Sequence, residues 1–217
     1  MKSKVRKYLS SDKWYHATTL DGFKKICDMG VKADYNKGNE LDFGFGFYLT
    51  PQRDKAETFI KNVLEYDNSE VGDSITESFG LPIKENKDKK IPVVIEFSFV
   101  PLECFENTSY NYKILNAYDD EFAEFVFNNR VNNLSEENQH EFDLIFGVMS
   151  DSLPTILIQK YKNKELTKEN VIEGLKKSTA VKQLSIHNQK ICDIIKINKA
   201  YYVESGEELD LNVKYNK

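Results

Sequence analysis

Apolar residues recur along this chain with two different periods, and each period predicts a different kind of element. Short runs of alternating or clustered apolar residues, rich in aromatic and β-branched types, predict strands. These strands are Lys13–Thr18, Phe45–Thr50, Pro92–Phe99, Phe142–Met149, Gln183–His187 and Ala200–Glu204. Segments whose apolar residues share one helix face predict helices at Leu20–Met29, Arg53–Tyr66, Asp119–Val131, Thr167–Lys177 and Asn188–Ile195. Because strands and helices intermix without regular alternation, the sequence favours an α+β arrangement over a doubly wound parallel sheet.

The chain has 217 residues, of which 40% are hydrophobic, and is long enough to bury one substantial core. We therefore predict a single domain over residues 1–217. Within it, the stretch Asp67–Lys90 is rich in Glu, Lys, Asp, Ser and Gly and predicts a long mobile loop. Such a loop is either disordered or a lid over a cleft.

The overall balance of charge does not indicate a nucleic-acid-binding protein. The chain carries 30 Lys and Arg residues against 35 Asp and Glu residues, which gives a formal net charge of −5 and a pI near 5.4. Basic residues cluster at Lys2–Lys7, Lys84–Lys90 and Lys176–Lys182. These clusters either solubilise loops or flank a cleft that accepts a phosphate backbone.

The spacing of cysteines and histidines argues against several classes of site. The three cysteines are widely spaced, odd in number and without a C-x-x-C pair, which disfavours a disulfide framework or a zinc site and favours a reducing cytoplasm. The three histidines lack the spacing of metal ligands, so we expect no metal. No apolar run reaches membrane-spanning length, and the basic amino terminus continues into polar residues. We therefore expect no membrane partner and no export by a signal peptide.

Two segments carry the residues best suited to ligand chemistry. Trp14 and His16 lie on one face of a predicted strand, and Asp42–Thr50 is an aromatic segment that contains Gly44 and Gly46. Glycines there permit a ligand or another backbone to approach closely. Each segment alone is better explained by core packing. The pair is more informative, because one helix and a polar turn join the two segments and allow both strands to meet in one cleft.

The same residues resemble the ADP-ribosyltransferase superfamily, on the branch shared by diphtheria toxin and the poly-ADP-ribose polymerases. Within that branch, the chain is most similar to a family of small prokaryotic domains marked by Tyr-His-x-[Ser/Thr] and Asp-Phe-Gly-x-Gly-Phe-Tyr-x-Thr. The first motif corresponds to Tyr15–Thr18 and the second to Asp42–Thr50. One departure is Ala17, where the superfamily often has a glycine after the histidine. Further landmarks correspond to Phe122–Val126 with Asn129-Arg130, Phe142–Gly147 with Asp151, and Gln183–His187.

This resemblance implies a fold of two small, mostly antiparallel sheets that form a cleft, with peripheral helices, and it implies NAD⁺ as the substrate. Nicotinamide is a pyridinium in NAD⁺ and leaves as a neutral ring, so catalysis relies on positioning and electrostatics. The family pattern assigns His16 to hold a ribose hydroxyl and Tyr48 to stack on nicotinamide. The NAD-binding residues that the resemblance implies are His16, Ala17, Thr18, Phe45, Gly46, Tyr48 and Arg130.

A third catalytic group is expected at the ribose 2′-hydroxyl. By its order along the chain, Gln183 is the candidate that the resemblance supplies, and Glu121, which borders an apolar helix stripe, is its acidic rival. Each is otherwise explained as a surface residue. Arg130, near a helix end, either binds a phosphate or complements the helix dipole. An amide as the third group implies single ADP-ribose transfer or NAD⁺ hydrolysis rather than polymer elongation.

Together these features predict an NAD-dependent mono-ADP-ribosyltransferase that modifies a protein, DNA or RNA. By analogy with small bacterial domains of the superfamily, the expected role is that of an intracellular toxin or a phage-defence effector, and whether an antitoxin accompanies it stays open. Two other functions also stay open. One is an NAD glycohydrolase, and the other is a non-catalytic domain that binds a nucleotide or a protein on the same fold.

Overall fold

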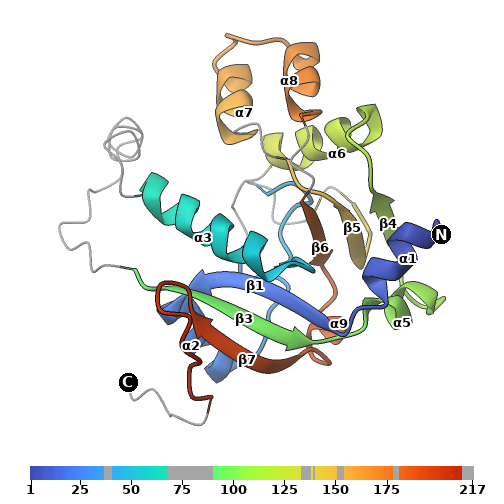
Figure 1. Ribbon diagram of the computed structural model, residues 1–217. Helices are drawn as coiled ribbons and strands as arrows, with labels where there is room; N and C mark the ends of the chain where they lie inside the picture. The colour runs from blue at the N-terminus through green and yellow to red at the C-terminus, as the bar shows by residue number, and fades with distance from the viewer. Residues whose placement is uncertain are drawn as a thin grey trace.

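The computed structural model describes residues 1–36, 41–67, 90–132, 138, 140–150, 154–177 and 181–211. In this part of the chain, two small sheets and eight helices surround two large apolar cores (Figure 1). The α+β arrangement with two small sheets, predicted from the sequence, is confirmed. The loop predicted over Asp67–Lys90 lies outside the described residues except at its ends, and so does Asp151.

Each sheet is built mostly from antiparallel strands. The first sheet has the order β1-β3-β7, with β1 (Lys13–Thr19), β3 (Pro92–Ser98) and β7 (Lys196–Tyr202). The second sheet has the order β2-β6-β5-β4, with β2 (Phe47–Leu49), β6 (Lys182–Ile186), β5 (Leu144–Val148) and β4 (Tyr112–Leu115). The pair β4–β5 is parallel.

Helices cover both sheets (Figure 1). They are α1 (Ser3–Leu9), α2 (Leu20–Met29), α3 (Arg53–Asp67), α5 (Pro101–Glu106), α6 (Asp120–Val131), α7 (Pro154–Lys162), α8 (Lys168–Leu175) and α9 (Gln189–Cys192). On one face of the first sheet, Ala56 and Ile60 of α3 pack against Val94 of β3. Phe23 of α2 packs into the core on the opposite face. No helix in the described part of the chain combines the length and the apolarity needed to cross a membrane.

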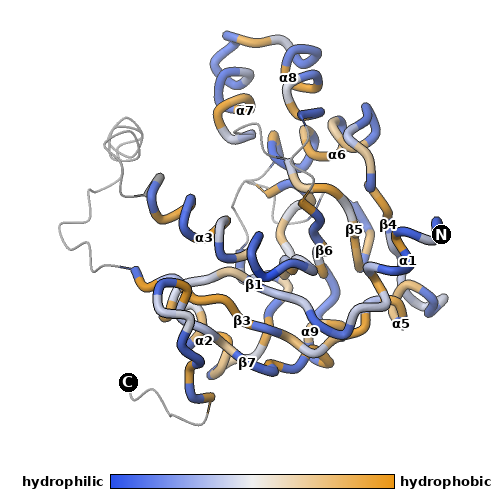
Figure 2. The backbone as a smooth tube through the Cα atoms, in the orientation of Figure 1, coloured by the Kyte–Doolittle hydropathy of each residue, from blue (hydrophilic) through white to orange (hydrophobic). Residues whose placement is uncertain are grey.

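Strand alternation divides the apolar side chains between the two large cores. Phe47 and Phe146 of the second sheet pack with Phe97 of the first sheet. The intervening residues, such as Ile145, point to the other core and meet Phe122 of α6. Figure 2 shows this apolar character along β3 and β5, where nearly every residue is buried. The second sheet is therefore covered on both faces, which fixes the strand that carries the aromatic segment.

Several element limits differ from those predicted. The sequence prediction missed α1, α5, β4 and α7. Strand β7 begins at Lys196 rather than Ala200, because an irregularity opposite Glu96 and Phe97 interrupts the alternation that the pattern would show. The helix predicted over Asn188–Ile195 is confined to Gln189–Cys192. The next residues form hydrogen bonds of the 3₁₀ type, in which Ile194 and Ile195 donate to the carbonyls three residues before them.

Candidate functional site

One isolated bridge joins the two sheets beside the predicted site. The N–H of Tyr15 donates to the carbonyl of Thr50 at 2.8 Å, and the N–H of Thr50 donates to the carbonyl of Tyr15 at 2.9 Å. These two bonds hold β1 and β2 side by side. His16 and Tyr48, which are 32 residues apart in the sequence, therefore become neighbours in space.

A hydrogen bond fixes the form of the His16 imidazole. Its Nδ1 lies 2.8 Å from the carbonyl oxygen of Tyr48, and because a carbonyl only accepts, Nδ1 carries the proton. Burial lowers the pKa of His16, and the bond to Tyr48 opposes that effect only in part. The ring is thus neutral at pH 7, and its Nε2 is a hydrogen-bond acceptor.

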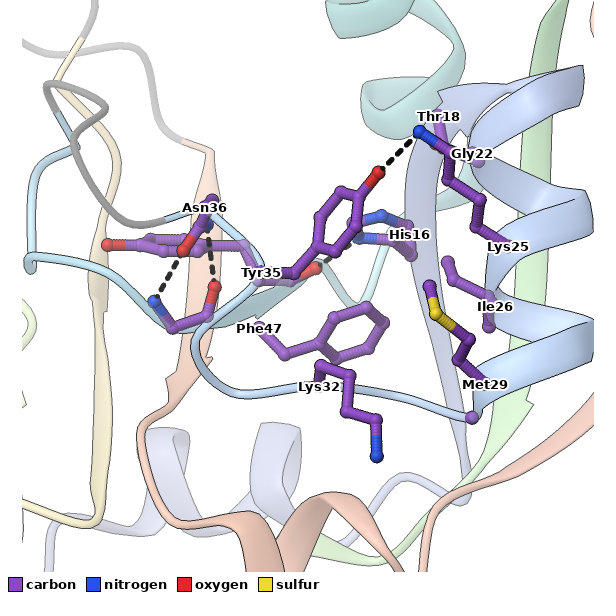
Figure 3. A pocket seen from close by; sticks show the side chains of 13 residues that line it. His16, Thr18, Gly22, Lys25, Ile26, Met29, Lys32, Tyr35, Asn36 and Phe47 are labelled. Atoms are coloured by element: carbon purple, nitrogen blue, oxygen red, sulfur yellow. Dashed lines mark hydrogen bonds between the residues drawn. The ribbon is translucent and has the colours of Figure 1, made fainter.

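His16 lines a cavity of about 130 Å³ between β1, α2, β2 and the segment 31–36 (Figure 3). An apolar cavity of about 150 Å³ holds one benzene-sized ring, so the enclosed volume suits a single aromatic ring. A whole dinucleotide would extend beyond it onto the surface. The lining residues are His16, Thr18, Gly22, Lys25, Ile26, Met29, Gly30, Lys32, Tyr35, Asn36, Gly46, Phe47 and Tyr48.

Two aromatic rings flank the cavity. Phe47 stacks on the His16 imidazole, with ring centroids 4.5 Å apart, and its own position is fixed by an edge contact with Phe97. Tyr35 is 59% exposed, and its hydroxyl accepts a hydrogen bond from the Lys25 ammonium at 3.0 Å (Figure 3). Figure 3 shows the Tyr35 ring near both His16 and Phe47, with Lys25 on the neighbouring helix. The cavity is therefore apolar and aromatic inside and carries cationic groups at its rim.

Gly46 is held tightly where the backbone enters β2. The side-chain amide of Asn36 donates to the carbonyl of Gly46 at 2.7 Å, and its oxygen accepts from the Gly46 N–H at 2.9 Å. A Cβ atom at Gly46 would lie only 2.7 Å from Nδ1 of His187. The glycine thus permits the close backbone approach that the sequence indicated, and the neighbour it accommodates is a protein side chain.

Tyr48 contributes to the cavity while its hydroxyl is bound elsewhere. The hydroxyl donates to the carbonyl of Gly44 at 2.7 Å and accepts from the N–H of Phe43 at 3.0 Å. Burial, together with the nearby Asp42 carboxylate, holds the pKa of Tyr48 far above its usual range, so the phenol stays protonated. The side chain packs against the second core, whereas the adjacent Phe47 faces the first core.

Gln183 and Arg130, both predicted as site residues, lie in a buried polar network around Asp42. Arg130 donates from Nε and Nη2 to Oδ1 of Asp42, at 2.9 and 2.7 Å. Gln183 donates to Oδ2 of Asp42 at 3.0 Å and to the carbonyl of Val148 at 3.1 Å, and Ser150 donates from both its backbone and its hydroxyl. None of these four side chains lines the cavity around His16. Their contacts anchor the start of the loop that leads to Tyr48.

The remaining predicted residues divide between the cavity and other surroundings. Thr18 lines the cavity. Ala17 packs on the opposite face of β1, beside α3, and the carbonyl of Phe45 accepts hydrogen bonds outside the cavity. The Glu121 side chain is 63% exposed and pairs with Lys113 at 2.5 Å, on a helix that does not border the cavity. The structure therefore places His16, Thr18, Gly46 and Tyr48 at the cavity but does not add Gln183, Glu121 or Arg130 to them. Tyr48 meets His16 through its carbonyl, while its ring packs on the second core and Phe47 stacks on His16 instead.

Residues 31–197 match the model of a family described as a protein of unknown function, DUF3990. The chain belongs to the DUF3990 family. The matched residues make up about three quarters of the chain and include the segment 31–36, β2 and the buried Asp42 network. They begin after β1 and α2, so His16, Thr18 and Lys25 lie ahead of the DUF3990 match. No curated protein and no solved structure matches the chain.

Sequence reasoning missed several residues of this DUF3990 chain that shape the cavity. Lys25, Tyr35 and Asn36 were not predicted as cavity residues. Lys25 lies on the exposed surface of α2, and Tyr35 and Asn36 lie in a turn beside β2, where the sequence has no periodic pattern. Phe47 had a signal, since it alternates with Tyr48 in the aromatic strand and must face the opposite side. Among the described residues, no cluster of three or more His, Cys, Asp or Glu side chains could hold a metal ion.

Proposed function

We propose that this chain is an NAD⁺-dependent mono-ADP-ribosyltransferase whose active site is the cavity around His16. The observation that carries the proposal is the contact between His16 and the Tyr48 carbonyl at 2.8 Å, beside a cavity the size of one ring. It unites the two motifs through which the chain resembles the superfamily. It also leaves Nε2 of a neutral imidazole able to accept a hydrogen bond from a ribose hydroxyl.

The reaction suits a site without a general acid near the leaving group. The bond between the ribose C1′ and the nicotinamide nitrogen breaks, and its electron pair neutralises the pyridinium. The acceptor's nucleophile then bonds to C1′ and releases its proton to solvent. The protein's part is to orient ribose through His16 and to surround the ring with aromatic side chains, where a cationic ring is favourable.

The charges around the cavity favour an anionic nucleotide. Lys25 and Lys32 are among its lining residues, and no lining residue in the described part of the chain is Asp or Glu. Lysine ammonium groups attract phosphate as point charges. A pyrophosphate linked to a ring inside the cavity would lie at this cationic rim.

A second candidate function is nucleotide binding without transfer. This function is favoured by the positions of Gln183 and Glu121, the two candidates for the third catalytic group. Gln183 is bound to Asp42 and Glu121 is bound to Lys113, away from the cavity. The described lining of the cavity offers no carboxylate to an oxocarbenium-like ribose. Binding of NAD⁺ without release of nicotinamide would identify this function.

Nicotinamide release is the test of the proposed function. Purified protein incubated with NAD⁺ is expected to release nicotinamide, and His16→Ala is expected to lower the rate at least tenfold, because the ribose loses its orienting acceptor. Tyr15→Phe is the matched control, since this neighbour points to the opposite face of β1, and it should retain the wild-type rate. Addition of protein, DNA and RNA fractions, with detection of free and attached ADP-ribose, separates transfer from hydrolysis. A wild-type protein that neither binds nor cleaves NAD⁺ would contradict the proposal.

A further inference from the structure

Two histidines outside the cavity hold the loop that enters β2. Nε2 of His140 lies 2.8 Å from the carbonyl oxygen of Phe43, and Nδ1 of His187 lies 2.7 Å from that of Phe45. Each ring therefore donates an N–H to a backbone carbonyl. The amide of Asn138 donates to the Phe45 carbonyl as well, at 2.8 Å.

The loop held in this way is directly connected to the cavity. The N–H of Phe43 and the carbonyl of Gly44 bind the Tyr48 hydroxyl, and the Tyr48 carbonyl binds His16. Gly46, the residue before β2, lines the cavity, and a Cβ atom there would lie 2.7 Å from Nδ1 of His187. A shift of the loop would therefore move both Tyr48 and Gly46.

The second nitrogen of each histidine is an acceptor, so both rings hold the loop in the neutral state. Nδ1 of His140 accepts from the backbone N–H of Phe142 at 3.2 Å, and protonation would set two N–H groups against each other. Nε2 of His187 lies 2.8 Å from the hydroxyl of Ser185, which is fully buried and can donate to it. The two rings are 4.6 Å apart, so two positive charges would repel at close range.

The surroundings of the pair also disfavour its protonation. The rings of Phe125 and Phe142 face His140, at 5.4 and 5.6 Å between centroids, and the Lys113 ammonium lies over the same two rings, 6.0 and 5.7 Å from their centroids. Ser185, Asn138 and the two carbonyls also contact the pair, and the bonds to the carbonyls act in the opposite direction, because they raise the pKa of both rings. Burial lowers the pKa of His140, and burial together with His140 lowers the pKa of His187 to about 3.

We propose that His140 and His187 are positioning residues of the His16 cavity, which hold the Phe43–Phe45 loop as neutral rings and release it when they are protonated. The inference rests on the proposed function in that the cavity is taken to bind NAD⁺. Its structural part, the control of the loop by the two rings, does not depend on the ligand.

The pH range follows from the sign of the shifts. In the unfolded chain a histidine titrates near 6.5, and in the folded chain His187 titrates at about 3. We call the state in which the rings hold the loop closed and the state in which they release it open. The stabilisation from the neutral ring is present above pH 6.5 and is lost as the pH falls toward 3, because His187 binds a proton in the open state more readily than in the closed state. If His187 titrates near 6.5 in the open state and at about 3 in the closed state, the ratio of closed to open states falls by about 25-fold between pH 7 and pH 5.

The test uses two substitutions that keep the donors but cannot be protonated. The amide nitrogen of Asn occupies the position of Nδ1, and that of Gln the position of Nε2, so the double variant His140→Gln, His187→Asn retains both bonds to the loop. Hydrogen exchange of the peptide 41–50 is measured at pH 7.5 and pH 5.0, together with the peptide 92–98 of β3. NAD⁺ affinity is measured by calorimetry on the same samples.

At pH 7.5 the two proteins are expected to show equal exchange and equal affinity. At pH 5.0 the wild type should exchange at least tenfold faster than the double variant in 41–50, with little difference in 92–98, and should bind NAD⁺ more weakly in proportion to the fraction of molecules in the open state. The titration of His16 is common to both proteins and cancels in the comparison. The exchanged variant His140→Asn, His187→Gln misplaces both donors and should lose protection at both pH values.

Equal exchange of the wild type and the double variant at pH 5.0 would overturn the positioning role, and so would an equal rise in both peptides, which indicates global unfolding. Failure of the proposed function has a different signature. In that case NAD⁺ does not bind either protein at any pH, whereas the pH-dependent difference in exchange over 41–50 persists.

Discussion

Replacement of Arg130 by methionine is expected to lower the free energy of unfolding by about 3–5 kcal/mol, because it leaves a buried carboxylate without its cation. Asp42 is 4% exposed and receives two hydrogen bonds from Arg130. Ser150 and Gln183 still donate to it after the substitution, but they carry no charge. Urea denaturation at pH 7 measures the change.

Glu121→Gln is the control for this prediction. It removes the charge of Glu121, whose side chain is 63% exposed, from its pair with Lys113, and ion pairs at the surface contribute up to about 1 kcal/mol. If Arg130→Met costs no more than the control, the Asp42 network does not stabilise the fold as we describe. The same comparison tests how much the anchoring of the loop by the Asp42 carboxylate contributes to stability.

Gly44→Ala is expected to be the most disruptive single-methyl substitution in this loop. The glycine has a φ of +79°, which costs an L-residue about 1–2 kcal/mol. In addition, a Cβ would lie 2.1 Å from Oδ1 of Asn138 and 3.1 Å from Oδ1 of Asn129, and such overpacking costs about 1–3 kcal/mol. The expected loss of about 2–5 kcal/mol is measured by thermal or urea denaturation.

Gly206→Ala separates the two causes of that loss. Gly206 has nearly the same φ, +73°, but a Cβ there meets nothing within 4 Å. It should therefore show the backbone cost alone, about 1–2 kcal/mol. Equal losses at Gly44 and Gly206 would mean that the amide oxygens of Asn129 and Asn138 move aside without cost, and that the loop is held less tightly than its contacts indicate.

Local signals in the sequence predicted most of the secondary structure well. Helix α2 has the limits expected, because the Thr19 hydroxyl caps its first turn and Gly30 follows its last residue with a positive φ. Strand β4 was missed because it is only four residues long and its pattern is not alternating. The β1–β2 bridge is a contact between distant segments, and only the joint presence of two motifs suggested it.

The positions of Gln183 and Glu121, the two candidates for the third catalytic group, depend on contacts that the local sequence does not reveal. The alternation in β6 places Gln183 and Ser185 on the face opposite Leu184 and Ile186, but that polar face is buried too, so the pattern does not tell that Gln183 meets Asp42. The ion pair of Glu121 with Lys113 could not be predicted, because Lys113 comes from the unpredicted strand β4. By contrast, His16 and Thr18 share one strand face, and the structure places both at the cavity as that periodicity indicates.

The most direct measurement for the central claim is the ¹⁵N spectrum of the histidine side chains during titration with NAD⁺ at pH 7. The chain has three histidines, so single substitutions assign every signal. We expect His16 to be a neutral ring protonated at Nδ1, and we expect NAD⁺ to shift its Nε2 signal while the signals of His140 and His187 change little. A His16 signal that stays unchanged in millimolar NAD⁺, or a ring protonated at Nε2, would contradict the account.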